Sequence, residues 1–112
     1  TGHGLITGNG NSLEIAQRYK DRLYMMHMDD NHGLQGEECW EDPKKMCTCD
    51  EHLNPFMGNV DWEGFAKIVA ASPYQLPVVM EVSKRTREEK EFLEESLLTG
   101  KRFTEMVLKY RQ

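Results

Sequence analysis

Two short apolar runs, separated by a helical pattern, give the chain its clearest organisation. Residues 23–28 and residues 78–82 are almost continuously apolar, which is typical of strands that are buried on both faces. Between them, residues 62–69 carry apolar side chains at helical spacing; Asp61 stands at the expected N-cap, and the helix is expected to end near Ser72. Strands that alternate with helices in this way predict an α/β fold with a parallel sheet.

The regions before and between the two strands are less regular. Ser12, or Asn11 before it, can cap a helix that continues to about Lys20. The first strand is followed by residues 29–60, which show no clear periodicity. Connections of that length in compact domains are usually functional or disordered. We therefore expect part of the protein's chemistry in this connection.

After the second strand the pattern becomes helical again. Thr86 and Glu89 have the spacing of a capping box for a helix that runs to about Leu98. Gly100 is expected to break that helix, and residues 103–110 then predict another helix with its own apolar stripe. The predicted order is helix, strand, helix, strand, helix and helix.

A sheet of two strands is incomplete by itself. It would leave unpaired backbone groups at its edges and apolar surface exposed to water. The sequence also begins with neither an initiator methionine nor the pattern of a secretory signal. We therefore expect residues 1–112 to be one part of a larger domain, or to complete the sheet with an oligomeric partner.

Composition narrows the class of protein. Hydrophobic residues make up 38% of the chain, and no apolar run approaches the roughly 20 residues that cross a bilayer. The 19 acidic and 14 basic residues give a net charge of -5 at pH 7. The basic residues form no extended patch before the C-terminal tail, whereas a dedicated nucleic-acid-binding protein would show one. We therefore expect neither a membrane span nor a nucleic-acid partner.

Three cysteines lie close together in the long connection. Cys39, Cys47 and Cys49 are odd in number, so they do not indicate the disulfide framework of a secreted protein. We expect free thiols in a loop and a reducing cytoplasm. The alternative is a zinc site with His52 as the fourth ligand, but the spacing matches no common structural zinc module.

Each predicted strand carries one metal-binding type of residue near its carboxyl end, His27 in the first and Glu81 in the second. Ligands bind at this end of parallel α/β folds because the loops that leave it surround a common crevice. A lone histidine in an apolar strand is often a hydrogen-bonded core residue, so His27 alone does not establish a ligand. Glu81 favours a metal, because a carboxylate buried in a strand is costly unless a cation or a strong donor offsets its charge.

Further metal-ligating side chains occur outside the strands, at His3, His32, Asp50 and His52. Asp50 and His52 are two positions apart, so in an extended segment they point the same way and could hold one ion. The Asp-x-His pair also occurs in solvated turns, and the motif alone leaves both interpretations open. Oxygen and imidazole donors together suit Zn²⁺, Mn²⁺ or a similar divalent ion.

Taken in order, four segments resemble the carboxyl-terminal part of the sugar phosphate isomerase/epimerase superfamily, the xylose isomerase-like TIM barrels. They are TGH, LYMMHMDDNHG, DEHLNPFMGNVDW and VVMEVS, and the resemblance covers about residues 1–83. It implies a C-terminal fragment of a (β/α)8 TIM barrel: the end of strand six, then strands seven and eight with their helices. Residues 1–112 would be that part of one barrel domain, and the missing N-terminal part would be needed to close the sheet.

The resemblance also implies roles for individual residues. His27 and Glu81 match two of the four ligands of the principal metal, a divalent ion such as Mn²⁺, Zn²⁺, Mg²⁺ or Co²⁺. Glu81 also matches a catalytic acid/base. His3 matches the histidine of an Asp-x-x-His motif whose aspartate would precede Thr1. Asp50 and His52 match a pair that, together with His3, binds an additional zinc in the related endonuclease IV-type AP endonucleases.

The function implied for the complete barrel is metal-dependent isomerisation or epimerisation of a sugar or sugar phosphate through an enediolate. The isolated fragment is expected to be inactive. Two other interpretations remain: a metal-dependent phosphodiesterase acting on abasic DNA, which His3, Asp50 and His52 would favour, and a barrel fragment without catalytic activity.

Overall fold

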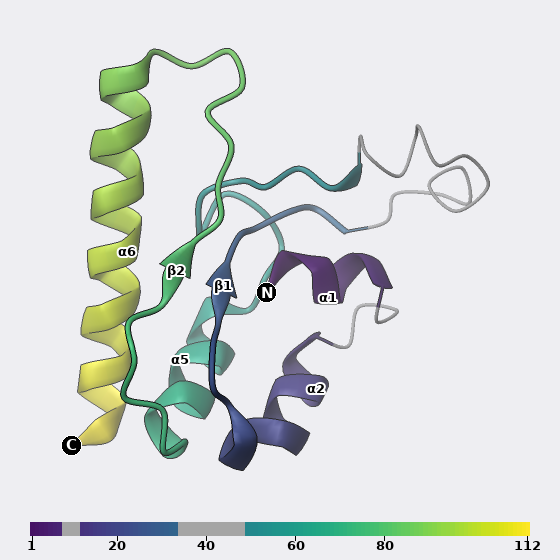
Figure 1. Cartoon of the computed structure of the whole chain (residues 1–112), viewed down its shortest axis with the longest axis vertical. Helices are drawn as coiled ribbons and strands as arrows, with labels where there is room; N and C mark the ends of the chain where they lie inside the picture. Colours follow the sequence, from purple (N-terminus) through teal and green to yellow (C-terminus); the bar gives the residue numbers. More distant parts are fainter. Residues whose placement is uncertain (8–11, 34–48) are drawn as a thin grey trace.

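The computed structural model describes residues 1–7, 12–33 and 49–112 (Figure 1). Its two strands run side by side, with α6 next to β2 and the N-terminus next to β1. The elements are α1 (Gly2–Thr7), α2 (Ser12–Tyr19), the 3-10 helix η1 (Lys20–Arg22), β1 (His27–Met28), α5 (Trp62–Ala71), β2 (Val79–Met80) and α6 (Glu89–Arg111).

Strands β1 and β2 form a parallel pair, as the sequence predicts. His27 pairs with Val79 and Met28 with Met80. The Glu81 backbone N–H extends the ladder by donating to the Met28 carbonyl at 2.9 Å. Both strands are much shorter than expected, because each has one strand neighbour within the described part of the chain. The expectation that both faces of the strands are buried is also wrong, since Val79 is 44% exposed.

Helix α5 is the centre of the core. Its Trp62 ring packs edge-on against Phe103 of α6, with ring centroids 5.6 Å apart, and Phe65 and Val69 are buried on the same side. The predicted N-cap is confirmed, since the Asp61 carboxylate accepts a hydrogen bond from the Gly64 backbone N–H at 2.8 Å. The core therefore forms where α5 and α6 meet the sheet.

Two expectations about the C-terminal half are wrong. Helix α6 runs unbroken through Gly100, and its N-cap is Glu88, which makes no side-chain capping bond. A glycine in a helix interior costs only about 1 kcal/mol. Burial of Phe103 and Val107 on the α6 face that packs against α5 outweighs such a cost. The helix α1 at the N-terminus has no signal in the sequence, whereas α2 lies where its pattern predicts.

Asp30 ties the long connection to the rest of the fold. Its backbone pairs with Leu53 in an antiparallel bridge, with both N···O distances 2.8 Å. Its buried carboxylate accepts from the Val60 N–H at 3.0 Å and from the Trp62 indole N–H at 2.7 Å. Residues 49–60 are thereby held close to the end of β1. Among the described helices, none combines the length and the apolar character that crossing a membrane requires.

Candidate metal and active site

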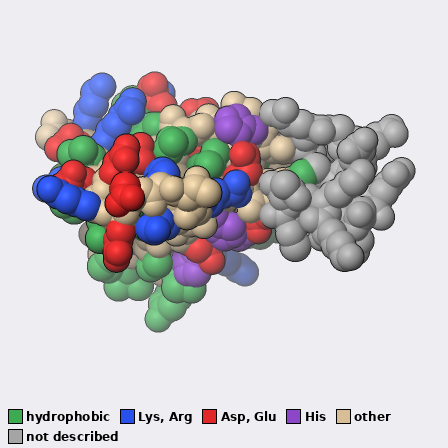
Figure 2. Space-filling model, turned by 90° about the horizontal axis from the view of Figure 1, so that it is seen from above, with side chains coloured by type: hydrophobic (Ala, Val, Ile, Leu, Met, Phe, Trp, Pro, Cys, Tyr) green, Lys and Arg blue, Asp and Glu red, His purple; other side chains and the backbone are tan. Residues whose placement is uncertain are grey.

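Polar side chains converge at the end of the molecule toward which both strands run. Seen from that end, histidine and acidic side chains lie together on the surface (Figure 2). His27 belongs to β1, and Glu81 directly follows β2. His27 pairs with Val79, so Glu81 lies two residues further along the adjacent chain segment, and the two side chains meet diagonally: His27 Nδ1 lies 3.1 Å from Glu81 Oε2.

The contact between His27 and Glu81 has the spacing of two ligands of one ion. Donor atoms about 2.0–2.2 Å from a metal lie roughly 3 Å from one another. The side chains are 42% and 39% exposed. The expectation that the Glu81 carboxylate is buried is therefore wrong, and this pair is accessible from solvent.

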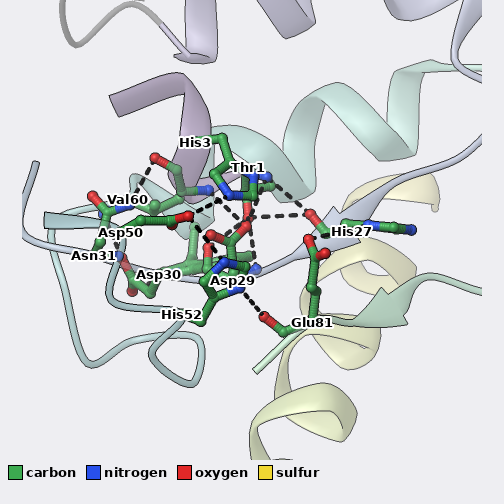
Figure 3. A network of polar contacts seen from close by, with 12 residues as sticks. Thr1, His3, His27, Asp29, Asp30, Asn31, Asp50, His52, Val60 and Glu81 are labelled. Atoms are coloured by element: carbon green, nitrogen blue, oxygen red, sulfur yellow. Dashed lines mark hydrogen bonds and ion pairs between the residues drawn. The ribbon is translucent and has the colours of Figure 1, made fainter. Parts of the chain in front are cut away.

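A second group of metal-ligating side chains comes from three separate segments. His3, Asp29, Asp50 and His52 each offer one donor atom, and these atoms all lie within 4.8 Å of one another (Figure 3). A single oxygen, Asp50 Oδ2, lies 3.1 Å from both His3 Nε2 and His52 Nε2. The structure thus brings together three of the four residues that the sequence singles out beyond the strands, His3, Asp50 and His52, and adds Asp29.

His52 is oriented by the backbone that follows β2. Its Nδ1 lies 2.9 Å from the Glu81 carbonyl, which can only accept, so Nδ1 carries the proton. Its Nε2 then faces the Asp50 carboxylate either as a lone pair or as a second N–H. Burial lowers the pKa of His52, but the Glu81 carbonyl and the Asp50 and Asp29 carboxylates outweigh burial and raise it above its usual value. Positive charge, from a proton or a metal ion, is therefore stabilised at Nε2.

Asp29 is the member of the group that sequence reasoning missed. Its Oδ1 accepts from the backbone nitrogens of Thr1 at 3.2 Å and Gly2 at 3.0 Å. Its Oδ2 is buried without a hydrogen-bond partner, and so is Asp50 Oδ1. Asp29 is two positions after His27, just as His52 is two positions after Asp50. Because residues two positions apart in a strand point to the same side, this spacing could have identified Asp29 as a candidate ligand from the sequence.

The donor set of this group fits a divalent cation. Two imidazoles and two carboxylates are ligands that Zn²⁺, Mn²⁺ and Co²⁺ accept. Buried carboxylate oxygens that lack a donor, here Asp29 Oδ2 and Asp50 Oδ1, are costly, and a nearby cation would offset part of that cost.

The remaining candidates lie apart from this group. His32 pairs instead with Glu51, with Nδ1 to Oε2 at 2.9 Å. Cys49 is disulfide-bonded, so the expectation of free thiols is wrong for this residue, and the alternative zinc site with Cys49 as a thiolate ligand does not form. Cys39 and Cys47 lie outside the described residues.

A parallel sheet with metal-ligating side chains at its carboxyl end is the arrangement of α/β enzymes. Comparison with known proteins makes the class specific: the profile of the xylose isomerase-like TIM barrel family matches residues 1–100. The chain belongs to this family. The family includes sugar isomerases and epimerases as well as endonuclease IV, it is generally enzymatic, and its members typically bind metals.

One curated relative is longer than this chain. Uncharacterized protein y4fM of Sinorhizobium fredii (strain NBRC 101917 / NGR234) is 28% identical over 113 residues, which cover 99% of this chain and 32% of the relative. The chain therefore spans about a third of the length of that protein. No solved structure matches the chain significantly.

Proposed function

We propose that the chain is the C-terminal part of a barrel enzyme that isomerises or epimerises a sugar or sugar phosphate with the help of a divalent metal ion. The observation that carries the proposal is the meeting of His27 and Glu81 at the carboxyl ends of neighbouring parallel strands, 3.1 Å apart. Membership in a family that includes sugar isomerases and epimerases supports the same reaction class.

The contacts of Thr1 support a place for the chain within the barrel. The Thr1 nitrogen donates to the His27 carbonyl at 2.9 Å, and its hydroxyl donates to the Asp29 carbonyl at 2.6 Å. Residues 1–3 therefore run along the edge of β1 that β2 does not cover. In the proposed barrel they follow strand six, while β1 and β2 are strands seven and eight. A residue joined to Thr1 would lie beside His27, where a further ligand is needed.

The roles of the residues follow from their positions. A divalent ion held by His27 and Glu81 would polarise a carbonyl and an adjacent hydroxyl, which lowers the cost of an enediolate. Glu81 is partly exposed and reaches out from the end of β2, so its carboxylate can remove a proton from a substrate carbon and return it. His27 would share the ion with Glu81, since its Nδ1 lies only 3.1 Å from Glu81 Oε2.

Phosphodiester hydrolysis of abasic DNA is the second candidate. It is favoured by the gathering of His3, Asp50 and His52 at one place, since metal-assisted hydrolysis of phosphodiesters commonly uses additional metal sites. The net charge of -5 argues against it, because a DNA-binding surface is expected to be basic.

The test compares two activities in a protein that carries the complete barrel. We expect Mn²⁺-dependent epimerisation or isomerisation of sugars, and no nicking of abasic DNA. Glu81→Gln and His27→Ala should each lower turnover by about 10²–10⁴-fold, the usual contribution of a positioned acid or base. His27→Ala should also lower the metal content.

The matched control is His32→Ala, which removes an exposed imidazole that pairs with Glu51 away from the site. It should keep both metal content and turnover. Nicking of abasic DNA without sugar turnover would overturn the proposal, as would normal turnover of both site variants.

A further inference from the structure

The two carboxylate oxygens of Asp29 differ: one accepts hydrogen bonds within the fold, and the other accepts none. Asp29 is 0% exposed. Its Oδ1 accepts from the Thr1 and Gly2 nitrogens, whereas its Oδ2 has no hydrogen-bond partner. An oxygen of this carboxylate lies within 4.8 Å of donor atoms of His3, Asp50 and His52. We propose that Asp29 is a metal ligand and completes with these three residues a cation site of two histidines and two carboxylates, distinct from the His27–Glu81 pair.

Charge supports this assignment. Asp29 and Asp50 bring two carboxylates into one group, and each has a buried oxygen without a donor. Like charges that approach one another away from water repel, and their cost falls only when a positive charge lies between them. The Thr1 ammonium pairs with Asp29 Oδ1 at 3.2 Å, which leaves Asp50 uncompensated, and the imidazoles supply a positive charge only when they are protonated. A divalent cation neutralises both carboxylates at once.

The orientation of His52 supports the same conclusion. Because its Nδ1 proton is committed to the Glu81 carbonyl, a neutral His52 directs the lone pair of Nε2 toward Asp50 Oδ2 at 3.1 Å. Two acceptors at that distance need a proton or a metal ion between them, and a divalent ion would also reach the other ligands of the group. A hydrogen bond from the outer nitrogen of a metal-ligating histidine to a carbonyl is also the usual support for such a ligand.

A purely structural role for Asp29 explains the position of Oδ1 but not that of Oδ2. Asp29 holds residues 1–3 through Oδ1 and through its backbone, which exchanges hydrogen bonds with the Thr1 hydroxyl at 2.6 and 3.0 Å. None of these contacts involves Oδ2. Moreover, a Cβ on residue 2 would lie 2.4 Å from Oδ2, so Gly2 leaves room beside the unused oxygen.

The first experiment is zinc titration by calorimetry of a protein that carries the complete barrel and of its Asp29→Asn variant, together with thermal unfolding of both with and without zinc. The amide oxygen of asparagine still accepts from the Thr1 and Gly2 nitrogens, while the second oxygen and the charge are lost. We expect zinc affinity at this site to fall at least tenfold and the stabilisation by zinc to shrink. Without zinc, the unfolding temperature should change little, because the amide oxygen still accepts from both nitrogens and only the attraction to the Thr1 nitrogen is weakened.

Asp61→Asn is the matched control, because asparagine caps helices as well as aspartate does and Asp61 is exposed on α5. It should leave zinc affinity unchanged. Zinc affinity that is equal in Asp29→Asn and the unsubstituted chain would overturn the assignment and leave Asp29 as a structural clamp.

A second experiment needs no substitution at Asp29. Anomalous scattering from zinc-soaked crystals of the unsubstituted complete barrel should give a peak within bonding distance, about 2.0–2.2 Å, of Asp29 Oδ2. A peak held by His3, Asp50 and His52 without Asp29, or no peak at this group, would overturn the proposal. In His27→Ala the peak should persist, so failure of the sugar chemistry and failure of this site give different results.

Discussion

Asp29 and Asp30 show how differently two neighbouring buried carboxylates can be used. Both oxygens of Asp30 accept hydrogen bonds from the Val60 and Trp62 nitrogens, so this residue fastens the loop to α5. Asp29 has an oxygen left over, and its carboxylate lies among metal-type donors. The sequence shows both as acidic residues after a strand, and their separate roles become visible only when the partners from distant segments are known.

Asp30→Asn should destabilise the fold. An amide can offer only one acceptor oxygen, so its NH₂ group must face either the Val60 N–H or the Trp62 indole N–H. A buried donor left without an acceptor costs about 1–3 kcal/mol. Urea unfolding followed by tryptophan fluorescence should show a loss of that size, whereas Asp29→Asn should show a smaller loss in the absence of metal, because its amide oxygen still accepts from the Thr1 and Gly2 nitrogens. Equal stability of the two variants would contradict the roles assigned here.

His52 combines a metal-ligating type of side chain with an unusual backbone conformation. It has a positive φ of 49°, a left-handed conformation that is uncommon for residues other than glycine. The Ser83 N–H donates to its carbonyl at 2.8 Å, and its own Nδ1 donates to the Glu81 carbonyl. Contacts with the segment after β2 therefore hold a conformation that the local sequence disfavours. Such over-determined backbone is common at functional sites.

Among the helices and strands, those specified by nearby residues were predicted best from the sequence. Helix α5 and its Asp61 cap follow from spacing and capping chemistry within about a dozen residues, and both are found as predicted. The parallel order of β1 and β2 follows from the helix between them. Helix α1 and the unbroken α6 could not be predicted, because residues 29–31 hold α1 in place and packing against α5 carries α6 through Gly100.

Gly100→Ala should stabilise the chain. The new methyl group would lie 3.7 Å from the Met80 sulfur, an ordinary van der Waals contact. Alanine in a helix interior is favoured over glycine by about 0.5–1 kcal/mol. Chemical denaturation should show a gain of that size, and a loss would mean that α6 is distorted at this position.

Gly58→Ala should have the opposite effect. Its methyl group would lie 2.4 Å from the Asn31 carbonyl oxygen and 2.5 Å from Asp30 Oδ1, so the loop and the β1 segment would have to separate. Crowding of this kind typically costs about 1–3 kcal/mol. A variant as stable as the unsubstituted chain in the same unfolding measurement would show that the two segments are not held together as described.

At the scale of the whole molecule, both sides of the sheet leave apolar surface uncovered. Tyr24 and Met25 before β1 are 79% and 61% exposed. On the other side, Val78, Met80 and Leu97 line an open groove of about 540 Å³ between β2 and α6. Exposed apolar surface on this scale usually marks an interface. In the proposed barrel these surfaces meet the neighbouring strands and helices, which accounts for their presence in a chain that is otherwise rich in charge.

The 112-residue chain studied alone should therefore self-associate. Light scattering coupled to size exclusion should show species larger than the 13.0 kDa monomer, and a dye that binds apolar surface should fluoresce strongly. A chain that carries the complete barrel is the control; it should bind little of the dye and should not aggregate. A monodisperse 13.0 kDa species that does not bind the dye would contradict the proposed place of the chain in a barrel.

Incorporation of solvent deuterium into the sugar tests the central claim most directly. If Glu81 removes a proton from carbon and returns one, sugar recovered after partial turnover of the complete barrel in D₂O with Mn²⁺ should carry deuterium at the reacting carbon, as measured by proton NMR. Glu81→Gln should give only the background level. Turnover without deuterium in either substrate or product, or equal incorporation by Glu81→Gln, would contradict the assigned role of Glu81.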